Sequence, residues 1–390
     1  MPPSDTPPAA SPAAAFDHAI SLFHRSYGIA PAVVTSAPGR VNLIGEHLDY
    51  NGGPALPFAI DRRTWVAAGL GPGFAMASTD PGHPPVRRIG GEPRGDWSDY
   101  VMGVVRELGR VGAVPAARIA IASDVPPGAG LSSSAALAVA SAAALTHLAG
   151  LDLPPDALAE TAFRAEYDYV GVRCGRMDQT VVAHAKEGTA LFLDTDTGAS
   201  DTCPFPYRLW IVPTGVEHAL ADGGYNARRS ECERALERCR ERWPHLSALA
   251  ALEPALLPEA LAFLPAPLDR RTRHVVAETA RVRQVRRALE REDLAEVGRL
   301  LVAGHASLRG DFESSVAEAD VLVDAAVESG AFGARLTGAG WGGSVILLVP
   351  EEIEAEVVER TVAAFARRFG RAPTAWRTRA AGGVRLDLVA

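Results

Sequence analysis

Residues 124–138, DVPPGAGLSSSAALA, constrain the fold of this chain more than any other segment. The apolar run ARIAIA precedes them and an alanine-rich segment follows, which predicts a strand, a tight glycine turn and a helix. Gly128 and Gly130 allow the backbone to turn with its amides exposed. Serines 132–134 stand at the start of the helix, where unpaired N–H groups and the helix dipole favour an anion. The segment is therefore either a cradle for phosphate or a Gly-Ser turn that only caps the helix.

The lysine content narrows the kind of phosphate site that is compatible with this segment. The chain contains a single lysine, Lys186, and it lies in HAKEGT. A Walker-type loop needs a lysine directly after its last glycine, so a site of that class is excluded. Any phosphate bound here would be held by backbone amides, hydroxyls and a metal ion.

Length and composition indicate a globular chain with two domains. The chain has 390 residues, of which 47% are hydrophobic and 22% charged, so it can bury a sizeable core. Its net charge of −8 argues against nucleic acid or an anionic membrane as a partner. The four cysteines show no CxxC spacing. This argues against a disulfide framework or a zinc site and favours a cytoplasmic location.

Neither a signal peptide nor a membrane span is expected. Residues 1–15, MPPSDTPPAASPAAA, lack the basic start and apolar core of a secretory signal and are predicted to form a disordered tail. The longest apolar run, residues 135–151, is mostly alanine and is interrupted by Ser141, Thr146 and His147. A buried helix explains it better than a span. The acidic surface carries no recognisable interaction motif, and we expect a monomer or a weak homo-oligomer.

A second stretch, residues 36–60, is dense in polar groups on every face and follows neither helical nor strand periodicity. Its polar side chains are Arg40, Asn42, Glu46, His47, Asp49, Tyr50 and Asn51. One interpretation is a solvated loop. The other is a loop tied to the core by its apolar residues, such as Val41 and Leu43, and suited to grip a polyhydroxylated small molecule.

Apolar periodicity predicts the remaining elements. Helices are expected over residues 16–28, 97–108, 154–171, 269–289 and 294–308 and from residue 226, and strands over 32–37, 65–70, 190–193 and 209–213. The polar connection at 195–201 predicts a domain boundary.

Three side chains on these elements each allow two interpretations. Trp97 is either a core anchor or a ligand contact. Glu166, at the edge of an apolar stripe, is either a surface group or a metal ligand. Asp178 either caps the helix that follows it or carries chemistry.

A third glycine-rich stretch, ARLTGAGWGGSVILLVP at residues 334–350, matches the pattern G-x-G-x-x-G. A dinucleotide site requires a helix after those glycines, whereas SVILLV reads as a strand. The context therefore excludes that site. It predicts a glycine turn between two strands, close to a ligand or to another backbone.

Seven segments together resemble one family. GRVNLIGEHLDYNGG, PPGAGLSSSAAL and LTGAGWGGS, in this order, are similar to the three motifs of the GHMP small-molecule kinases, and the first resembles the galactokinase signature within them. CGRMDQ, TGVEHALADGGYNARR, RRTRHVVAE and HASLRGDFESS are similar to other galactokinase segments. The resemblance runs from about Ser36 to Val349.

This resemblance implies a two-domain α+β fold. Residues 16–200 would form an N-terminal domain like the second domain of ribosomal protein S5, which binds ATP and the sugar. Residues 201–390 would form a ferredoxin-like C-terminal domain, with the active site in the cleft between the two. The implied reaction is the transfer of phosphate from ATP, with Mg²⁺ as cofactor, to the anomeric hydroxyl of galactose.

The resemblance also implies a role for individual residues. Arg40 and Asp178 match the catalytic pair, in which Asp178 either abstracts the proton or mainly orients and stabilises, while Arg40 keeps Asp178 ionised. Ser134 and Glu166 match ligands of magnesium. The positions that match the sugar site are Glu46, His47, Leu48, Asp49, Gly175 and Tyr225. The positions that match the nucleotide site are Gly128, Ala129, Gly130, Leu131, Ser132, Ser133, Ser134 and Trp97.

Four positions depart from the family pattern. Leu48 stands where the family usually has Thr, Ala129 replaces a frequent glycine, and Trp341 and Ser344 replace Phe and Cys. The hydroxyl missing at position 48 leaves a related substrate open: N-acetylgalactosamine, arabinose or another hexose-like ring. A non-catalytic galactose sensor is a further alternative. The intact serine run, Arg40 and Asp178 argue against it.

Overall fold

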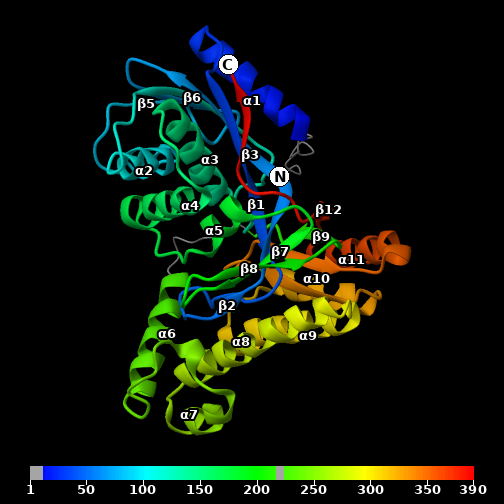
Figure 1. The fold of residues 1–390 in the computed structure, drawn as a ribbon. Coiled ribbons are helices and arrows are strands. Elements are labelled where there is room, and N and C mark those ends of the chain that lie inside the picture. Colours follow the sequence, from blue (N-terminus) through cyan, green and yellow to red (C-terminus); the bar gives the residue numbers. More distant parts are fainter. Residues whose placement is uncertain (1–11, 217–223) are drawn as a thin grey trace.

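The computed structural model describes residues 12–216 and 224–390 as two stacked halves. A six-stranded sheet with helices α1–α5 forms the upper half in Figure 1, and a four-stranded sheet with helices α6–α11 forms the lower half. The long strands β1 (Val33–Asn42) and β3 (Pro57–Leu70) run from one half toward the other (Figure 1). These two strands therefore connect the halves through the middle of the molecule.

The six-stranded sheet is covered by helices on both faces. Its strand order is β13-β1-β3-β6-β4-β5, and only the β4–β6 pair is parallel. The other strands are β4 (Phe74–Ser78), β5 (Val86–Arg88), β6 (Ala117–Ser123) and β13 (Arg385–Val389). Val33 packs with α3 on one face, while its neighbour Val34 packs with α1 on the other. The period of two along each strand thus buries both faces, and every residue of β1 is buried.

The helices of this half agree with the predicted elements, with one shifted boundary. They are α1 (Pro12–Tyr27), α2 (Ser98–Leu108), α3 (Ser133–Leu148), α4 (Pro155–Arg164), the π-helix η1 (Ala165–Val170) and α5 (Met177–His184). The predicted tail at 1–15 is wrong for residues 12–15, because α1 begins at Pro12 and buries Ala15 against the sheet with Ala19 and Phe23. Residues 1–11 lie outside the described residues. The alanine-rich run is a buried helix, as predicted.

The second half contains a β-α-β-β-α-β unit. Its sheet has the order β10-β11-β9-β12 with antiparallel pairs throughout, which is the ferredoxin-like arrangement expected. The strands are β9 (Arg208–Pro213), β10 (Gly333–Thr337), β11 (Ser344–Leu348) and β12 (Trp376–Arg379). A small sheet of β2 (Pro54–Ala55), β7 (Thr189–Asp194) and β8 (Ser200–Pro204) lies between the halves in Figure 1.

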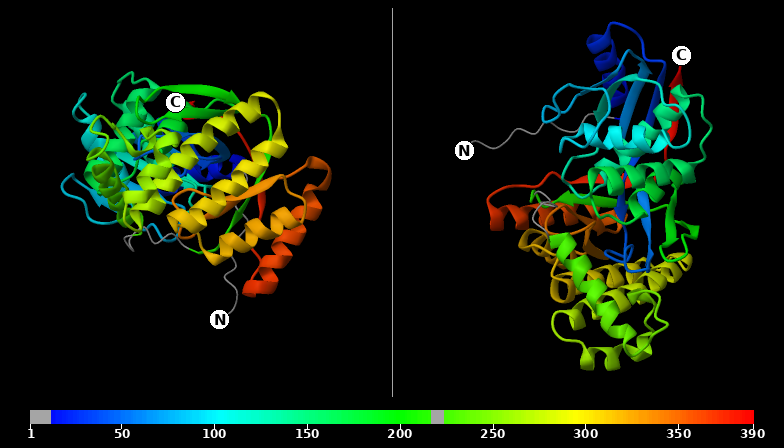
Figure 2. Two further views of the ribbon diagram at one scale, coloured as in Figure 1. Left: turned by 90° about the horizontal axis from the view of Figure 1, so that it is seen from below. Right: turned by 90° about the vertical axis from the view of Figure 1, so that its left-hand side faces the viewer.

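Long helices cover the second half. They are α6 (Gly224–Arg240), α7 (Leu257–Phe263), α8 (Leu268–Glu290), α9 (Leu294–Ser307), α10 (Ala317–Glu328) and α11 (Glu354–Phe369). Shorter helical turns are η3 (Leu249–Ala251), η4 (Pro254–Leu256), the π-helix η5 (Leu308–Phe312) and η6 (Glu351–Ile353). Figure 2 shows α6, α7 and α8 at the end of the molecule farthest from α1. In the part of the chain that the structure describes, no helix combines the length and hydropathy needed to cross a membrane.

The last strand departs from the predicted division of the chain at residue 200. β13 pairs antiparallel with β1, with Val389 opposite Val33 and Leu388 opposite Val34. The C-terminus therefore returns to the first sheet, close to α1 (Figure 1). The physical reason is that β1 would otherwise be an edge strand with unpaired backbone groups. The segment 201–390 is thus not confined to the second half.

Candidate active site

The glycine–serine turn lies at the N-terminus of α3. Ser132 is the N-cap and has a left-handed backbone (φ 56°), as do Gly128 (φ 66°) and Gly130 (φ 73°). Serines 132–134 line a cavity of about 220 Å³, and a methyl group added at Gly128 would meet no atom within 4 Å. The turn is therefore open to a ligand on the side where the amides of α3 begin. This geometry suits an anion rather than a buried structural turn.

Arg40 and Asp178 form an ion pair in the same cavity. Arg40 Nε donates to Asp178 Oδ1 at 2.7 Å and Nη2 donates to Oδ2 at 2.6 Å. Arg40 Nη1 donates to the Gly130 carbonyl at 2.7 Å, and the Ser132 hydroxyl donates to Asp178 Oδ2. A β-bulge between Pro38 and Arg40 turns the arginine toward the turn. The bidentate contact fixes the direction of the carboxylate.

Asp178 is not a helix cap. It lies in the first turn of α5, whose N-cap is Arg176, and its carboxylate faces Arg40 and Ser132. Because its side chain is 27% exposed, the carboxylate remains accessible from the cavity.

Glu166 is buried rather than exposed, and it faces the serine turn. Ser134 Oγ donates to Glu166 Oε1 at 3.1 Å, and Gln179 Nε2 donates to Oε2 at 2.7 Å. Desolvation, with a smaller contribution from the negative charge of Asp178, raises the pKa of Glu166 to about 7. The π-helix η1 carries Glu166 inward to this position. The surface interpretation of Glu166 is therefore wrong.

The charge of the cavity is mostly negative. Asp49, Glu166 and Asp178 all line it, and Arg40 also lines it. Burial and the nearby Asp178 raise the pKa of Asp49 to about 6. An excess of buried carboxylates is the environment in which a divalent cation is favourable.

The loop after β1 brings the predicted sugar contacts to the opposite wall. Glu46, His47, Asp49, Gly175 and Tyr225 all line the cavity. A Cβ at Gly175 would overlap the Asp49 carboxylate and lie 2.9 Å from Asp49 Cβ, so only glycine permits this approach. The stretch 40–51 is thus an anchored loop rather than a solvated one, since its residues are buried or half-buried.

Glu46 and His47 are held by residues of the second half. Glu46 pairs with Arg335 of β10, and Arg335 Nη2 lies 2.9 Å from Glu278 Oε1 of α8. Burial raises the pKa of Glu46 to about 7 although Arg335 opposes the shift. His47 has a left-handed backbone (φ 64°), and its Nδ1 shares a hydrogen bond of 2.9 Å with Tyr50 Oη. Burial holds the pKa of His47 well below its usual value, so its ring is neutral near pH 7.

A second cavity of about 340 Å³ adjoins the first at Ser133 and Ser134. Trp97 and Tyr100 line it, and the Trp97 ring stacks on His83 with centroids 5.5 Å apart. Trp97 also belongs to the core that packs beneath α2 and α3, which confirms its role as a core anchor, and its contact with a ligand stays a prediction. The two cavities together extend from the sugar contacts, past the serines, to an aromatic wall.

Two predicted contacts do not reach the cavity. Leu48 is fully buried in the main apolar core, because the turn places its apolar side chain on the core side and not on the cavity side. Ala129 is buried as well, and its carbonyl accepts a hydrogen bond from Ser344 Oγ at 2.8 Å. Leu131, in contrast, lines the cavity as predicted. The assignments of Leu48 and Ala129 as ligand contacts are corrected accordingly.

The third glycine stretch is the predicted turn between two strands, β10 and β11. Gly338 lies against the glycine–serine turn, since a Cβ there would be 3.0 Å from the Gly130 carbonyl. A Cβ at Gly340 would overlap the Ser314 carbonyl. Both approaches of one backbone to another require glycine.

Several site residues were not predicted from the sequence. Val172, Cys174, Met177, Gly338 and Ala339 line the first cavity, and His83 lines the second. Cys174 and Met177 lie within or beside CGRMDQ, and Gly338 and Ala339 lie within LTGAGWGGS, so proximity to the motifs was the available signal. His83 has no such signal, because it lies in a polar connection.

Comparison with known proteins identifies the family. Residues 21–70 match the family model described as the galactokinase galactose-binding signature. Residues 99–186 match the GHMP kinases N terminal domain, and residues 285–368 match the GHMP kinases C terminal model. The galactokinase of Chloroflexus aggregans is 39% identical over 360 residues, which cover 90% of this chain and 92% of that protein. The chain belongs to the galactokinase family.

Other galactokinases extend the similarity. The galactokinase of Streptomyces coelicolor is 40% identical over 384 residues, covering 93% of this chain and 96% of that protein. The crystal structure of Lactococcus lactis galactokinase complexed with galactose matches with a TM-score of 0.90 at 28% identity, covering 95% and 99% of the two chains. Methanococcus jannaschii mevalonate kinase matches with a TM-score of 0.67 at 18% identity, over 90% and 98% of the chains, and shows the fold alone.

Membership of the galactokinase family makes this chain a sugar kinase that uses ATP as phosphate donor. The two-domain GHMP kinase fold is confirmed. Galactose is favoured over the alternative sugars, and a purely sensing role is not favoured.

Proposed function

We propose that this chain phosphorylates the anomeric hydroxyl of galactose at the Arg40–Asp178 pair and releases galactose 1-phosphate and ADP. The observation that carries this assignment is the bidentate contact of 2.6 and 2.7 Å in a cavity that also contains the serine turn. Phosphoryl transfer requires a positioned nucleophile and neutralised charge on the transferring oxygens. One cavity supplies both kinds of group.

Each wall of the cavity takes one part of the substrates. The amides and hydroxyls of Gly128, Gly130, Leu131 and serines 132–134 face the phosphates of ATP, and the adenine would lie in the adjoining second cavity, which Trp97 lines. Glu46, His47, Asp49, Gly175 and Tyr225 bind sugar hydroxyls. The hydroxyl to be phosphorylated then faces Asp178.

Asp178 orients this hydroxyl and accepts its proton during transfer. Arg40 holds the carboxylate in a fixed direction and, through its contact with Gly130, ties the sugar side of the site to the phosphate turn. Orientation of the hydroxyl therefore contributes together with proton transfer.

The residues around Glu166 fit a magnesium ion. Ser134 Oγ and Glu166 Oε1 are hard oxygen donors 3.1 Å apart, and the raised pKa of Glu166 reflects chiefly the burial of its carboxylate. Magnesium bound here, together with ATP oxygens, would neutralise charge on the phosphates. No cluster of three or more acidic, histidine or cysteine ligands occurs among residues 12–216 and 224–390, so ATP must supply part of the coordination.

A panel of free sugars tests the substrate assignment. Galactose, N-acetylgalactosamine, arabinose and glucose are each incubated with ATP and magnesium, and the product is analysed to locate the phosphate. We expect galactose to be the best substrate and to carry phosphate on its anomeric oxygen. Preference for another sugar, or phosphate on another hydroxyl, would contradict the proposal.

Asp178→Asn tests the catalytic assignment. We expect kcat to fall by about a hundredfold or more, because the amide cannot accept the proton, while the fold is unchanged. Thermal unfolding and circular dichroism verify the fold. Asp168→Asn, at an exposed position of η1, is the matched control and should keep full activity. Substantial activity in Asp178→Asn would remove this residue from the mechanism.

A further inference from the structure

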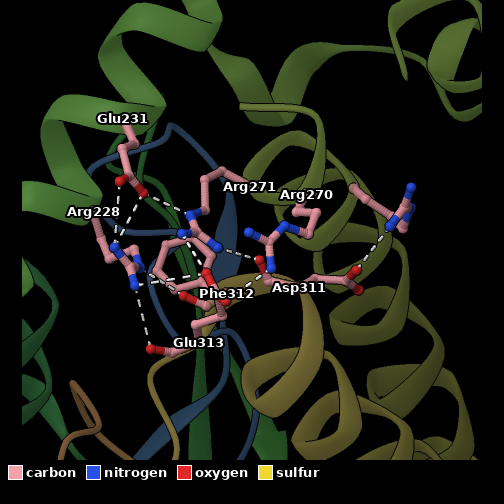
Figure 3. Close-up of polar contacts among 8 residues, drawn as sticks. Arg228, Glu231, Arg270, Arg271, Asp311, Phe312 and Glu313 are labelled. Carbon is pink, nitrogen blue, oxygen red and sulfur yellow. Dashed lines mark hydrogen bonds and ion pairs between the residues drawn. The ribbon is translucent and has the colours of Figure 1, made fainter. Parts of the chain in front are cut away.

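A cluster of ion pairs lies behind the sugar side of the cavity and joins three elements. Arg228 and Glu231 come from α6, Arg271 comes from α8, and Asp311, Phe312 and Glu313 form the end of η5 and the residue after it. Figure 3 shows these side chains converging on the Phe312 turn. None of these side chains lines the cavity, so the reaction steps described above do not use them.

Arg271 occupies the centre of this cluster. Its side chain is only 2% exposed, and all its polar groups have partners. Nε donates to Glu231 Oε2 at 2.6 Å, Nη1 donates to the Asp311 carbonyl at 2.6 Å, and Nη2 donates to Glu313 Oε2 at 2.7 Å. A planar guanidinium presents its donors in a rigid fork, which suits three acceptors held in fixed positions around it.

Arg228 holds the next carbonyl of the same turn. Its Nε donates to the Phe312 carbonyl at 2.7 Å, and its Nη1 lies 3.2 Å from Glu231 Oε2. Two successive carbonyls at the end of η5, which have no helical partner, are therefore satisfied by two arginines. Glu313, the residue after the turn, has a left-handed backbone (φ 55°) that is costly for a residue other than glycine. The ion pairs hold this strained conformation in place.

The turn presents one side chain to the active site. Phe312 is fully buried, and its ring stacks on His47 with centroids 4.3 Å apart and an interplanar angle of 30°. His47 lines the cavity. Its Nδ1 shares a hydrogen bond with Tyr50, its Nε2 is buried, and His47 also interacts with the backbone of Ala339. The position of the His47 ring thus depends on the Tyr50 contact and on the aromatic rings packed against it, of which Phe312 has the nearest centroid.

We propose that Arg271 is a positioning residue: it holds the Phe312 ring against His47 and so fixes the His47 ring in the wall of the sugar site. The inference rests on the proposed role of His47 in sugar binding. Arg228 supports the same turn and also lies over the Trp341 ring, which contacts His47 edge-on. The ion-pair cluster thus acts on sugar binding through the aromatic rings packed against His47, and Phe312 is the ring whose turn Arg271 holds.

The primary test is Phe312→Leu, because it removes the ring and leaves every ion pair intact. We expect both KM for galactose and Kd for galactose to rise about tenfold, and KM for ATP to stay within about twofold of the wild type. Calorimetry measures the Kd. Arg271→Met should produce the same split. Arg271→Lys should be intermediate, since an ammonium cannot bridge three acceptors in fixed geometry.

Arg273→Met is the control on α8, at a position two residues along the helix and therefore on a different face. Arg273 is 42% exposed, and its hydrogen bond among the described residues goes to the Asp311 carboxylate, not to a carbonyl of the turn. We expect both KM values to match the wild type within about twofold. An equal rise of galactose KM in this variant would overturn the proposal, because it would reduce the cluster to a general electrostatic effect.

A double mutant separates positioning from general destabilisation. His47→Asn removes the imidazole with a residue that tolerates a left-handed backbone. If Phe312 acts through His47, adding Phe312→Leu to His47→Asn should change galactose Kd by less than about twofold. A full tenfold loss in that background, or equal loss of ATP and galactose binding in the single variants, would overturn the inference. A wild-type protein that fails to phosphorylate galactose would instead overturn the proposed function.

Discussion

Glu166 is a carboxyl group whose burial has a measurable energetic consequence. Its pKa in the folded protein is about 7, above its usual value of 4.5, chiefly because of desolvation. Between these two values the folded state holds a proton that the unfolded state has lost, so the free energy of unfolding decreases as pH rises through this window. The contribution is at most roughly 3 kcal/mol, since one pKa unit corresponds to 1.36 kcal/mol.

We therefore predict that Glu166→Gln stabilises the ligand-free protein by roughly 1–3 kcal/mol at about pH 8 and changes little near pH 4.5. The new amide can be accommodated because Gln179 Oε1 is buried without a partner among the described residues, and a turn of the Gln179 amide lets it accept a hydrogen bond. Urea unfolding at both pH values measures the effect. Glu187→Gln, at an exposed position, is the control. Equal stability of Glu166→Gln and wild type at the higher pH would contradict the prediction. The same variant should lose its magnesium-dependent activity.

The position of Leu48 in the motif suggests a role in sugar selectivity, but its burial predicts a role in stability instead. Its side chain is fully buried in the core and is absent from the cavity lining. Leu48→Thr should therefore cost about 1–3 kcal/mol of unfolding free energy, because a hydroxyl enters an apolar site. The ratio of kcat/KM for galactose to that for N-acetylgalactosamine should stay within about twofold. A large shift in this ratio would show that position 48 does act on the sugar.

For single residues, the sequence predicted which residues belong to the site better than it predicted where their side chains point. Arg40, Asp178 and Glu166 come together as the family resemblance implied. The pattern could not show that Leu48 points away from its neighbours, since a tight turn has no period. The partners Gln179 and Arg335 were missed for another reason: both lie in segments that the sequence analysis quoted, but each reaches its carboxylate through a tertiary contact that the sequence pattern does not show.

At the scale of elements, the loop before α5 packs closely against the loop after β1. A single Cβ added at Gly175 would force the two loops apart. Gly175 has no room for a side chain, because the Asp49 carboxylate occupies that space. We predict that Gly175→Ala displaces the carboxylate and raises KM for galactose about tenfold or more, with KM for ATP within about twofold. Steady-state kinetics with each substrate varied in turn measures the split. Gly382→Ala is the control, since an added Cβ there meets no atom within 4 Å. An equal rise of KM for galactose and KM for ATP in Gly175→Ala would indicate a folding defect instead.

Element existence was predicted well from periodicity, and boundaries less well. The strand over 32–37 extends to Asn42 because the loop residues that follow it stay paired with β3. The helix predicted over 154–171 ends in a π-helical turn, η1, whose wider geometry aims Glu166 inward. Local sequence gives no sign of this change, which follows from the tertiary contact with Ser134.

For the whole molecule, the two-domain division at residue 200 missed the return of the chain to its first sheet. No periodicity in residues 385–389 marks a partner that lies more than 300 residues earlier in the chain, because strand pairing is a tertiary property. The return has a structural role: β13 covers β1, and Leu388 packs with Val34 on the α1 side of the sheet. Just before it, Arg63 Nη1 donates to the Gly382 carbonyl at 2.9 Å.

A chain that ends at Val384 tests this closure. It keeps Gly382 and the Arg63 contact but loses the strand, so β1 becomes an exposed edge. We predict a loss of about 2–4 kcal/mol in unfolding free energy, from the missing ladder hydrogen bonds and the exposed apolar surface. Because no residue of β13 lines either cavity, KM for both substrates should be close to wild type at low temperature. Leu386→Thr, at a half-exposed position of the same strand, preserves the ladder and should unfold like wild type. If the truncated chain unfolds at the same midpoint temperature as the wild type, the first sheet does not need its last strand for stability, and the prediction is wrong.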